Sequence, residues 1–309
     1  MNKYALTVEN LTKIYSNSKN KKDNKALSDL NFKVEQGEIF GLLGPNGAGK
    51  TTFLNILGGT VSKTKGVINV WGFDIDKNPR QVKASIGIVP QEVNLDAFFS
   101  PKKLLELQAG LYGITKKDRI TDLILKMVAL ENKANAYSRN LSGGMKRRLL
   151  IAKAMVHQPP VLILDEPTAG VDVELRNNLW KNVKELNSQG VTIILTTHYL
   201  LEAQEMCDRI AIIDKGSLVA LDTTQKLLDR IQKKKINLKV KNIDKNTIFK
   251  MKDVKFIINS HNSISVSYEK NTLDFGQIIN YLSQNNVKIL DIITEDGDLE
   301  DVFIKLTND

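Results

Sequence analysis

The stretch Gly44-Pro45-Asn46-Gly47-Ala48-Gly49-Lys50-Thr51 decides the fold, because it matches the phosphate-binding pattern G-x-x-x-x-G-K-[ST]. Glycines let such a turn present successive backbone N–H groups to phosphate oxygens, and the following helix adds its N-terminus. An apolar run from Glu38 to Leu43 precedes the turn, and a helical pattern from Thr51 to Leu57 follows it. This context favours a phosphate site over an ordinary glycine-rich turn. Lys50 is expected to reach the β- and γ-phosphates, and Thr51 to offer its hydroxyl to Mg²⁺.

A second chemical feature lies at the end of the apolar run Val161-Leu162-Ile163-Leu164, which leads into Asp165-Glu166-Pro167. Carboxylates at the C-terminal end of a strand sit where ligands bind in open α/β sheets. Asp165 is expected to hold Mg²⁺ through water, and Glu166 to act as the general base for an attacking water. The alternative is a strand-end turn stopped by proline, and the phosphate loop upstream disfavours it.

Short β-rich runs alternate with helical patterns over the first two-thirds of the chain, which predicts an α/β domain with a mainly parallel sheet. Ser16 to Lys25 is polar and is expected to be a solvated loop. From about Gln91 to Arg148 the pattern turns helical. Further strands are expected at Leu6–Val8, Asn31–Val34, Val161–Leu164, Thr192–Leu195 and Ile210–Ile213.

A basic run, Arg230 to Lys235, is expected to end the first domain, which gives domains at 1–230 and 236–309. The second domain shows β-like runs, then a helix from about Leu273 to Leu282, and a strand near Val287 to Ile293. These elements predict a small α+β fold. The expected β-like runs are Ile236–Val240, Lys255–Ile258 and Ser263–Ser267.

Leu141-Ser142-Gly143-Gly144-Met145 resembles the signature of the ABC ATPase family, although Met145 stands where the commonest version has Gln. Other motifs follow in the order of that family, and the resemblance covers about residues 4 to 225. It implies a P-loop NTPase fold with a RecA-like core, an antiparallel β subdomain and a helical subdomain at about 92–150. The further motifs are Tyr15, Val89-Pro90-Gln91, Ala169-Gly170-Val171-Asp172 and Thr197-His198.

The resemblance also implies roles for single residues. Glu166 and His198 are expected to be catalytic, with His198 reaching the γ-phosphate, and Thr51, Gln91 and Asp165 to hold Mg²⁺. The signature is expected to contact ATP held by the opposite subunit, so that two nucleotides join two chains. The expected ATP-binding residues are Tyr15, Gly44, Pro45, Asn46, Gly47, Ala48, Gly49, Lys50, Thr51, Thr52, Gln91, Ser142, Gly143, Gly144 and Asp172.

A finer resemblance is to the ATP-binding subunits of bacterial multidrug-type exporters, carried by Met145 to Arg148, Thr168 to Asp172, Leu195 to Leu200 and the ending Leu299 to Phe303. It implies ATP-driven export through a separate transmembrane permease, with this subunit on the cytoplasmic face of the cell membrane. The start of the chain has no signal-peptide pattern, and no apolar run approaches the length of a span. Two alternatives remain, namely an ABC ATPase acting on ribosomes or nucleic acid, and one assembling metal clusters.

The net charge of +9 is scattered along the chain, so no specific nucleic-acid partner is expected. The single cysteine, Cys207, excludes an internal disulfide and is expected to fill a core. Tyr15 is either an adenine platform or a strand-end packing residue, and Phe98 and Phe99 are either anchors for a membrane partner or core aromatics. His157 is expected at a helix end, and Lys146-Arg147-Arg148 on a solvated or structural face.

Overall fold

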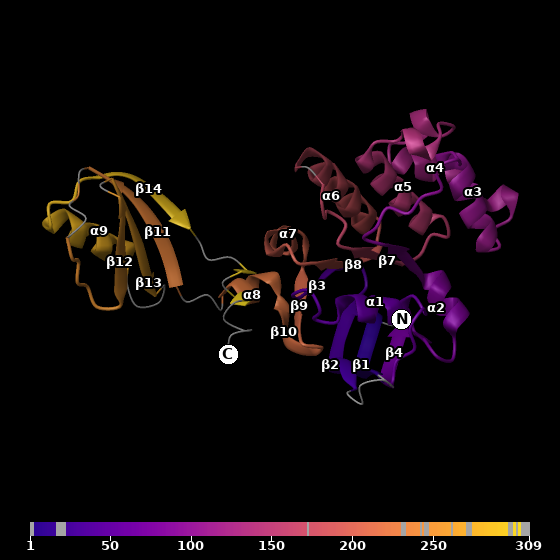
Figure 1. The fold of residues 1–309 in the computed structure, drawn as a ribbon, viewed down its shortest axis with the longest axis horizontal. Helices are drawn as coiled ribbons and strands as arrows, with labels where there is room; N and C mark the ends of the chain where they lie inside the picture. The colour runs from indigo at the N-terminus through magenta and orange to yellow at the C-terminus, as the bar shows by residue number, and fades with distance from the viewer. Residues whose placement is uncertain are drawn as a thin grey trace. The chain divides into compact units, whose positions relative to one another are not determined.

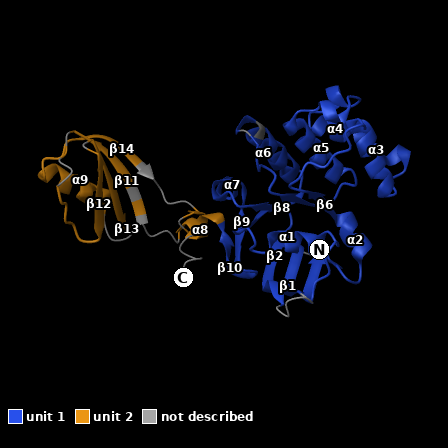
Figure 2. Cartoon of the chain, viewed as in Figure 1, with its two compact units in different colours: residues 1–223 blue, residues 224–309 orange. Residues whose placement is uncertain are grey.

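The computed structural model describes residues 3–16, 23–171, 173–229, 233–241, 243, 247–260, 262–269, 274–295, 299–300 and 302–303. The chain divides into two compact units, residues 1–223 and 224–309 (Figures 1 and 2). Asp172 and most of the expected loop from Ser16 to Lys25 lie outside the described residues.

The described part of the first unit contains a six-stranded central sheet with the order β10-β9-β3-β8-β7-β6. All neighbouring strands are parallel except β10, which runs antiparallel to β9. Every residue of β3 and β8 is buried, as in strands that are covered on both faces. The predicted parallel sheet is therefore confirmed. Its strands are β3 (Ile39–Leu43), β6 (Ile86–Val89), β7 (Val161–Asp165), β8 (Thr192–Thr197), β9 (Arg209–Asp214) and β10 (Ser217–Thr223).

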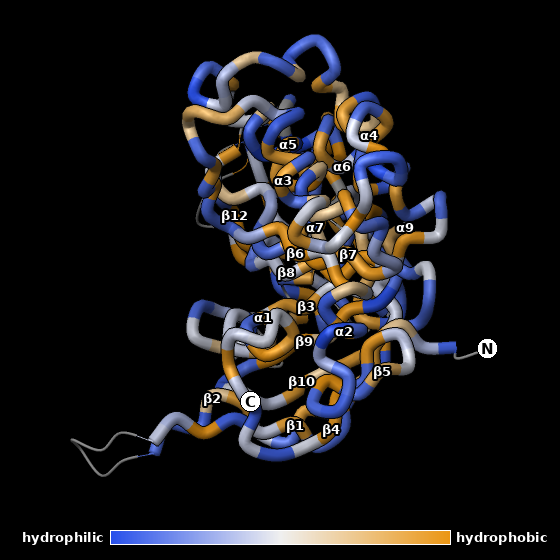
Figure 3. The backbone as a smooth tube through the Cα atoms, turned by 90° about the vertical axis from the view of Figure 1, so that its right-hand side faces the viewer, coloured by the Kyte–Doolittle hydropathy of each residue, from blue (hydrophilic) through white to orange (hydrophobic). Residues whose placement is uncertain are grey.

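A second sheet in the described part of this unit is antiparallel, with the order β2-β1-β4-β5. Helix α1 joins the two sheets in one core, because Phe53 of α1 packs against Phe32 of β2, which stacks on Phe40 of β3 at 5.6 Å. Hydrophobic residues gather along the central strands (Figure 3). The elements are β1 (Tyr4–Tyr15), β2 (Asn24–Glu35), β4 (Lys65–Val70), β5 (Phe73–Asp74), α1 (Lys50–Leu57) and α2 (Pro79–Ser85).

A helical subdomain interrupts the sequence between β6 and β7. Its core is built from one apolar face of each helix and includes Leu105, Ile124 and Leu149. Residues 91–100 are irregular, although the sequence pattern predicted helix from about Gln91, because the first helix starts only at Pro101 behind the Ser100 cap. The helices are α3 (Pro101–Leu111), α4 (Thr121–Met127) and α5 (Gly143–Met155), and α6 (Val173–Ser188) and α7 (Leu200–Met206) follow β7 and β8.

The described part of the second unit has a four-stranded antiparallel sheet with the order β12-β13-β11-β14. Alternate residues of β11 and β13, among them Leu238 and Val266, pack with Ile278 and Leu282 of α9. The predicted α+β fold is confirmed, with α9 and β14 each starting two residues later than the expected helix and strand. The elements are α8 (Thr224–Asp229), β11 (Lys233–Val240), β12 (Val254–Ser260), β13 (Ser263–Glu269), α9 (Phe275–Gln284) and β14 (Ile289–Glu295).

Among the residues that the structure describes, no helix is both long and apolar enough to cross a bilayer.

Candidate functional site

The phosphate loop lies between β3 and α1, and two of its glycines have backbone angles that favour glycine, with φ 84° at Gly47 and 109° at Gly49. A Cβ on Gly49 would lie 2.7 Å from Ala26 O, and one on Gly44 would lie 2.3 Å from Ile213 O. Gly49 also precedes α1 without a side-chain cap, so the first N–H groups of that helix are available to an anion.

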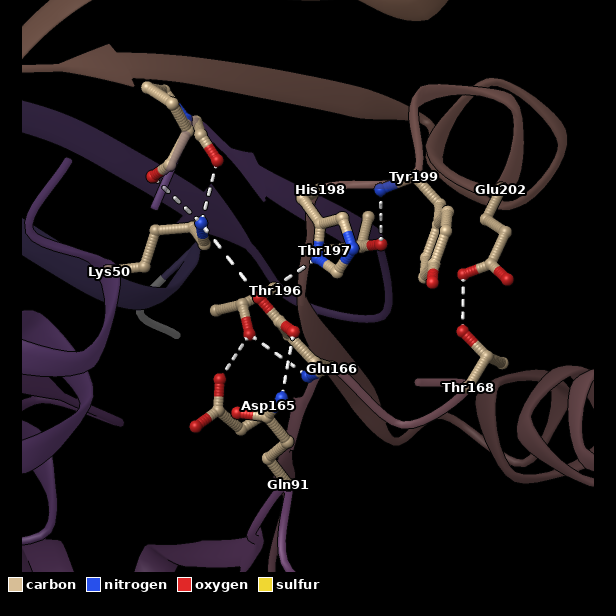
Figure 4. Close-up of polar contacts among 12 residues, drawn as sticks. Lys50, Gln91, Asp165, Glu166, Thr168, Thr196, Thr197, His198, Tyr199 and Glu202 are labelled. Atoms are coloured by element: carbon tan, nitrogen blue, oxygen red, sulfur yellow. Dashed lines mark hydrogen bonds and ion pairs between the residues drawn. The ribbon is translucent and has the colours of Figure 1, made fainter. Parts of the chain in front are cut away.

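Lys50 is buried at the start of α1, with its ammonium turned onto the loop itself. Its Nζ donates to Gly44 O at 2.6 Å and to Pro45 O at 3.2 Å, and it lies 4.0 Å from Glu166 Oε1 (Figure 4). Burial lowers the pKa of Lys50, and the nearby carboxylates of Glu166 and Asp165 oppose that shift. The ammonium therefore lies in the loop that would receive phosphates.

Glu166 follows the last residue of β7 and is held by side chains from other segments. Its Oε2 accepts from Gln91 Nε2 at 3.0 Å, and its Oε1 lies 3.2 Å from His198 Nδ1 (Figure 4). Its backbone has φ 43°, a strained conformation, and its N–H donates to Thr196 O at 3.0 Å. The two residues predicted to be catalytic thus lie in direct contact, with Gln91 beside them.

Asp165 is the last residue of β7 and directly precedes Glu166 in the chain. Thr196 Oγ1 donates to Asp165 Oδ1 at 2.6 Å. Burial raises the pKa of Asp165, and the bond from Thr196 opposes that change. Thr196 lies in the neighbouring strand β8, two residues before His198, and was not among the predicted site residues.

One open cavity of about 730 Å³ joins most of the predicted site residues. Tyr15 stands at its rim, at the end of β1, with Lys13 Nζ 4.7 Å from the ring centroid. Gly44, Ala48 and Asp165 do not line it, and Asp172 is outside the described residues. The described lining is Tyr15, Asn24, Lys25, Ala26, Pro45, Asn46, Gly47, Gly49, Lys50, Thr51, Thr52, Gln91, Glu166, His198 and Lys215.

The signature residues lie elsewhere, at the start of α5. Ser142 caps this helix, since its Oγ accepts from Met145 N at 3.3 Å. Ser142 and Gly143 are exposed, and a Cβ added to Gly143 would meet nothing within 4 Å. As far as the described residues form the lining, Ser142, Gly143 and Gly144 are not part of the 730 Å³ cavity. The cavity beside the phosphate loop therefore does not include the signature residues of the same chain.

Arg147 connects α5 to the segments around the cavity by hydrogen bonds. The sequence pattern predicted only a solvated or structural face for this residue. Its buried guanidinium donates to Gln91 O at 2.6 Å, to Pro90 O at 3.3 Å and to Ala169 O at 3.5 Å. Burial lowers the pKa of Arg147. The only signal in the sequence was its place in a basic cluster directly after the signature.

Replacing Arg147 with Met should lower the free energy of unfolding by about 1–3 kcal/mol, because the buried guanidinium and its bonds to three backbone carbonyl groups would be lost. Urea unfolding measures this loss. Lys146→Met, in the preceding position of the same helix, is the matched control and should change the stability by less than about 0.5 kcal/mol. Equal losses in the two variants would contradict the assigned role.

The remaining candidates are mostly structural. Phe98 is 69% exposed, so it is not a core aromatic, and the guanidinium of Arg139 lies 5.8 Å from its ring centroid. Cys207 is buried as expected, and burial raises the pKa of its thiol. His157 follows α5, stacks on Tyr112 at 3.8 Å and contacts Ile86 O through Nε2 at 3.0 Å.

Comparison with known proteins gives a consistent set of relatives. A family profile described as ABC transporter matches residues 27–169. The linearmycin resistance ATP-binding protein of Bacillus subtilis is 34% identical over 311 residues, which cover 98% of each chain. A Nod factor export ATP-binding protein I of Burkholderia thailandensis is 41% identical over 210 residues, which cover 67% of this chain and 69% of the relative.

Solved structures also resemble a large share of the chain. An ATP-binding cassette captured as a dimer in a post-hydrolysis state with ADP and Pi gives a TM-score of 0.62 at 26% identity, covering 71% of this chain and 98% of that one. A cbiO1 protein of Clostridium perfringens, described as part of an ABC transporter complex, gives a TM-score of 0.66 at 29% identity. It covers 74% of this chain and 92% of its own.

Proposed function

The chain belongs to the family of ABC transporter ATP-binding proteins, which hydrolyse ATP, and from this membership we propose that it powers export through a separate membrane subunit. The observation that carries the proposal is the convergence of Lys50, Gln91, Glu166 and His198 on one cavity next to the start of α1. Phosphoryl transfer requires such positioned charges and donors rather than covalent chemistry.

Within the cavity we assign ATP to the phosphate loop, with Lys50 and the N–H groups of α1 on the phosphates. Tyr15 at the rim is proposed to stack on adenine. Glu166 acts as the general base, and His198, which already contacts it, contacts the γ-phosphate. Two of the three N–H donors of Lys50 serve the carbonyl groups of Gly44 and Pro45, so directing the whole ammonium at the phosphates requires these bonds to be exchanged.

The donor set fits Mg²⁺ by its chemistry. Thr51 offers a hydroxyl, Gln91 an amide oxygen and Asp165 a carboxylate, and all three are hard oxygen ligands of the kind that Mg²⁺ prefers. Thr51 and Gln91 line the cavity, and Asp165 precedes Glu166. The ion, when bound with ATP, would neutralise charge on the phosphate oxygens.

We propose further that ATP closes two copies of the chain face to face. The signature caps α5 on an exposed surface outside its own cavity, and a helix N-terminus with bare N–H groups suits a γ-phosphate. A second copy supplies that phosphate. The dimeric cassette among the similar structures supports this arrangement.

The membrane partner is proposed from the relatives and from one exposed surface. The names of two relatives refer to linearmycin resistance and to Nod factor export, which supports export. Phe98, Phe99 and Tyr137 are exposed aromatic residues, and the guanidinium of Arg139 lies against the rings of Phe98 and Tyr137. We propose that a helix of the membrane partner inserts at this group. We therefore place the subunit on the cytoplasmic face of the membrane, with residues 236–309 as an accessory domain.

Co-expression tests this proposal. With a membrane subunit encoded beside it, the protein should sediment with membranes and resist a mild salt wash, whereas alone it should stay in the supernatant. Phe98→Ser should weaken membrane association about ten-fold or more, because a central aromatic anchor contributes about 2 kcal/mol or more. Leu111→Ser, an exposed apolar residue at the end of α3, is the control.

Association of the protein with ribosomes or nucleoid instead of membranes would favour the alternative of a nucleic-acid partner. Its binding to nucleic acid should then weaken steeply as the salt concentration rises.

A further inference from the structure

Glu202 in α7 is a buried carboxylate that no role above uses. It is 4% exposed, and its Oε2 accepts from Thr168 Oγ1 at 2.6 Å (Figure 4). Its Oε1 lies 3.2 Å from Arg176 Nε of α6, an ion pair whose atoms are not aligned as a hydrogen bond. A buried carboxylate is costly unless paired, so both partners matter for keeping it there.

Glu202 and its partner Thr168 lie in the two segments that follow the proposed catalytic residues, Glu166 and His198. Thr168 is 1% exposed and lies two residues after Glu166, in a turn closed by bonds from Ala169 N to Glu166 O and from Val171 N to Thr168 O. Helix α7 itself starts two residues after His198. The hydroxyl–carboxylate bond therefore joins the segment behind Glu166 to the helix behind His198.

A second connection closes this arrangement. The guanidinium of Arg176 lies 5.9 Å from the ring centroid of Tyr199, and the Tyr199 ring lies 4.2 Å from that of His198. His198 Nδ1 in turn contacts Glu166 Oε1. These contacts and the chain segments between them form a closed ring. Glu202 lies on one side of the ring, and Glu166 and His198 lie on the opposite side.

We propose that Glu202 is a positioning residue that, through Thr168, fixes the turn behind Glu166 against α7 so that Glu166 and His198 stay together during hydrolysis. The inference rests on the proposed roles of that pair. Neither Thr168 nor Glu202 lines the nucleotide cavity, so breaking the bond should change turnover and leave nucleotide affinity intact.

Thr168→Val is the main test, because it keeps the shape of the side chain and removes the hydroxyl. It should lower kcat about ten-fold, as expected for the loss of a buried bond to a charged group, with KM changed by less than about two-fold. Thr168→Ser should restore kcat to within about two-fold, because it keeps the hydroxyl. Glu205→Gln, an exposed change in the same helix, is the matched control and should have no effect.

A double variant tests whether the two residues act together. Glu202→Gln keeps an acceptor but loses the charge, so its loss of kcat should be smaller than that of Thr168→Val. The pair combined should be no more than about two-fold worse than Thr168→Val alone. Independent, multiplying losses would overturn the proposal, and so would a Thr168→Val enzyme with wild-type kcat or a Thr168→Ser enzyme as impaired as Thr168→Val.

Amide hydrogen exchange separates this inference from the proposed function. Exchange at residues 168–171 should be about ten-fold faster in Thr168→Val than in the wild type, with the strands of the central sheet unchanged. Unchanged exchange would overturn the inference. A wild-type protein that binds but never hydrolyses ATP would overturn the proposed function, and the exchange result would still decide whether Thr168 and Glu202 hold the turn.

Discussion

Glu166→Gln should lower the rate of ATP hydrolysis by about 10²–10⁴-fold while Mg·ATP still binds, because positioned general bases contribute about that factor. The change keeps the shape of a side chain that accepts from Gln91 and contacts His198, and removes its basicity and charge. Steady-state hydrolysis and calorimetric binding measure the two effects. Glu9→Gln, an exposed residue of β1, is the control for loss of one carboxylate.

The same variant should reveal the proposed shared site. Bound ATP that is not cleaved should hold two copies together, because the signature of each contacts the nucleotide of the other. Size exclusion should therefore show a monomer without nucleotide and a dimer with Mg·ATP. Adding Ser142→Arg should restore the monomer, because a bulky side chain blocks the contact between copies.

A second blocking variant is needed because Ser142 also caps α5, and loss of a cap costs about 1 kcal/mol. Gly143→Arg leaves the cap in place, and a Cβ there meets nothing within 4 Å of its own chain. Both changes should abolish the dimer without touching the phosphate loop. A Glu166→Gln protein that stays monomeric at saturating ATP, or a dimer that tolerates both arginines, would exclude the shared-site mechanism even with ATPase activity intact.

The fold was predictable from local patterns. A continuous apolar run such as Val161 to Leu164 gave a strand buried on both faces, and the order of strands and helical segments gave the parallel sheet. The irregular stretch from residue 91 to 100 was not predictable from periodicity alone. Distant residues hold its backbone at both ends, because Arg147 donates to Gln91 O and the N–H groups of Ser138 and Arg139 donate to Phe99 O and Ala97 O.

The phosphate loop and the carboxylates were readable because each is a short motif in which adjacent residues do one job. Contacts between distant segments were not readable in that way. Thr196 meets Asp165 across 31 positions of sequence, and Thr168 meets Glu202 across 34. A lone Thr or Glu has no motif of its own, so only the packing of β7 against β8 and of α7 behind them brings these groups together.

Lys50→Ala should weaken the binding of Mg·ATP by about 10–100-fold or more, since each charge-assisted hydrogen bond to phosphate contributes about 1.5–3 kcal/mol. The Lys50 ammonium donates to Gly44 O and Pro45 O, within the loop where phosphates would bind. Those neutral acceptors are poor substitutes for phosphate oxygens, so the exchange of partners should favour nucleotide binding. Isothermal titration with Mg·ATP measures the change.

Lys25→Ala is the matched control, because Lys25 lines the same cavity but its ammonium is exposed and lies 3.6 Å from Asp29. An exposed pair of this kind contributes little, so the control should bind ATP within about two-fold of the wild type. Thermal unfolding of both variants shows whether each is still folded. This check is needed because Lys50 lies 4.0 Å from Glu166, and Lys50→Ala removes that partner of the Glu166 carboxylate. If Lys50→Ala is folded and still binds ATP as tightly as Lys25→Ala, the phosphates do not lie in this loop, and the assignment of the cavity is wrong.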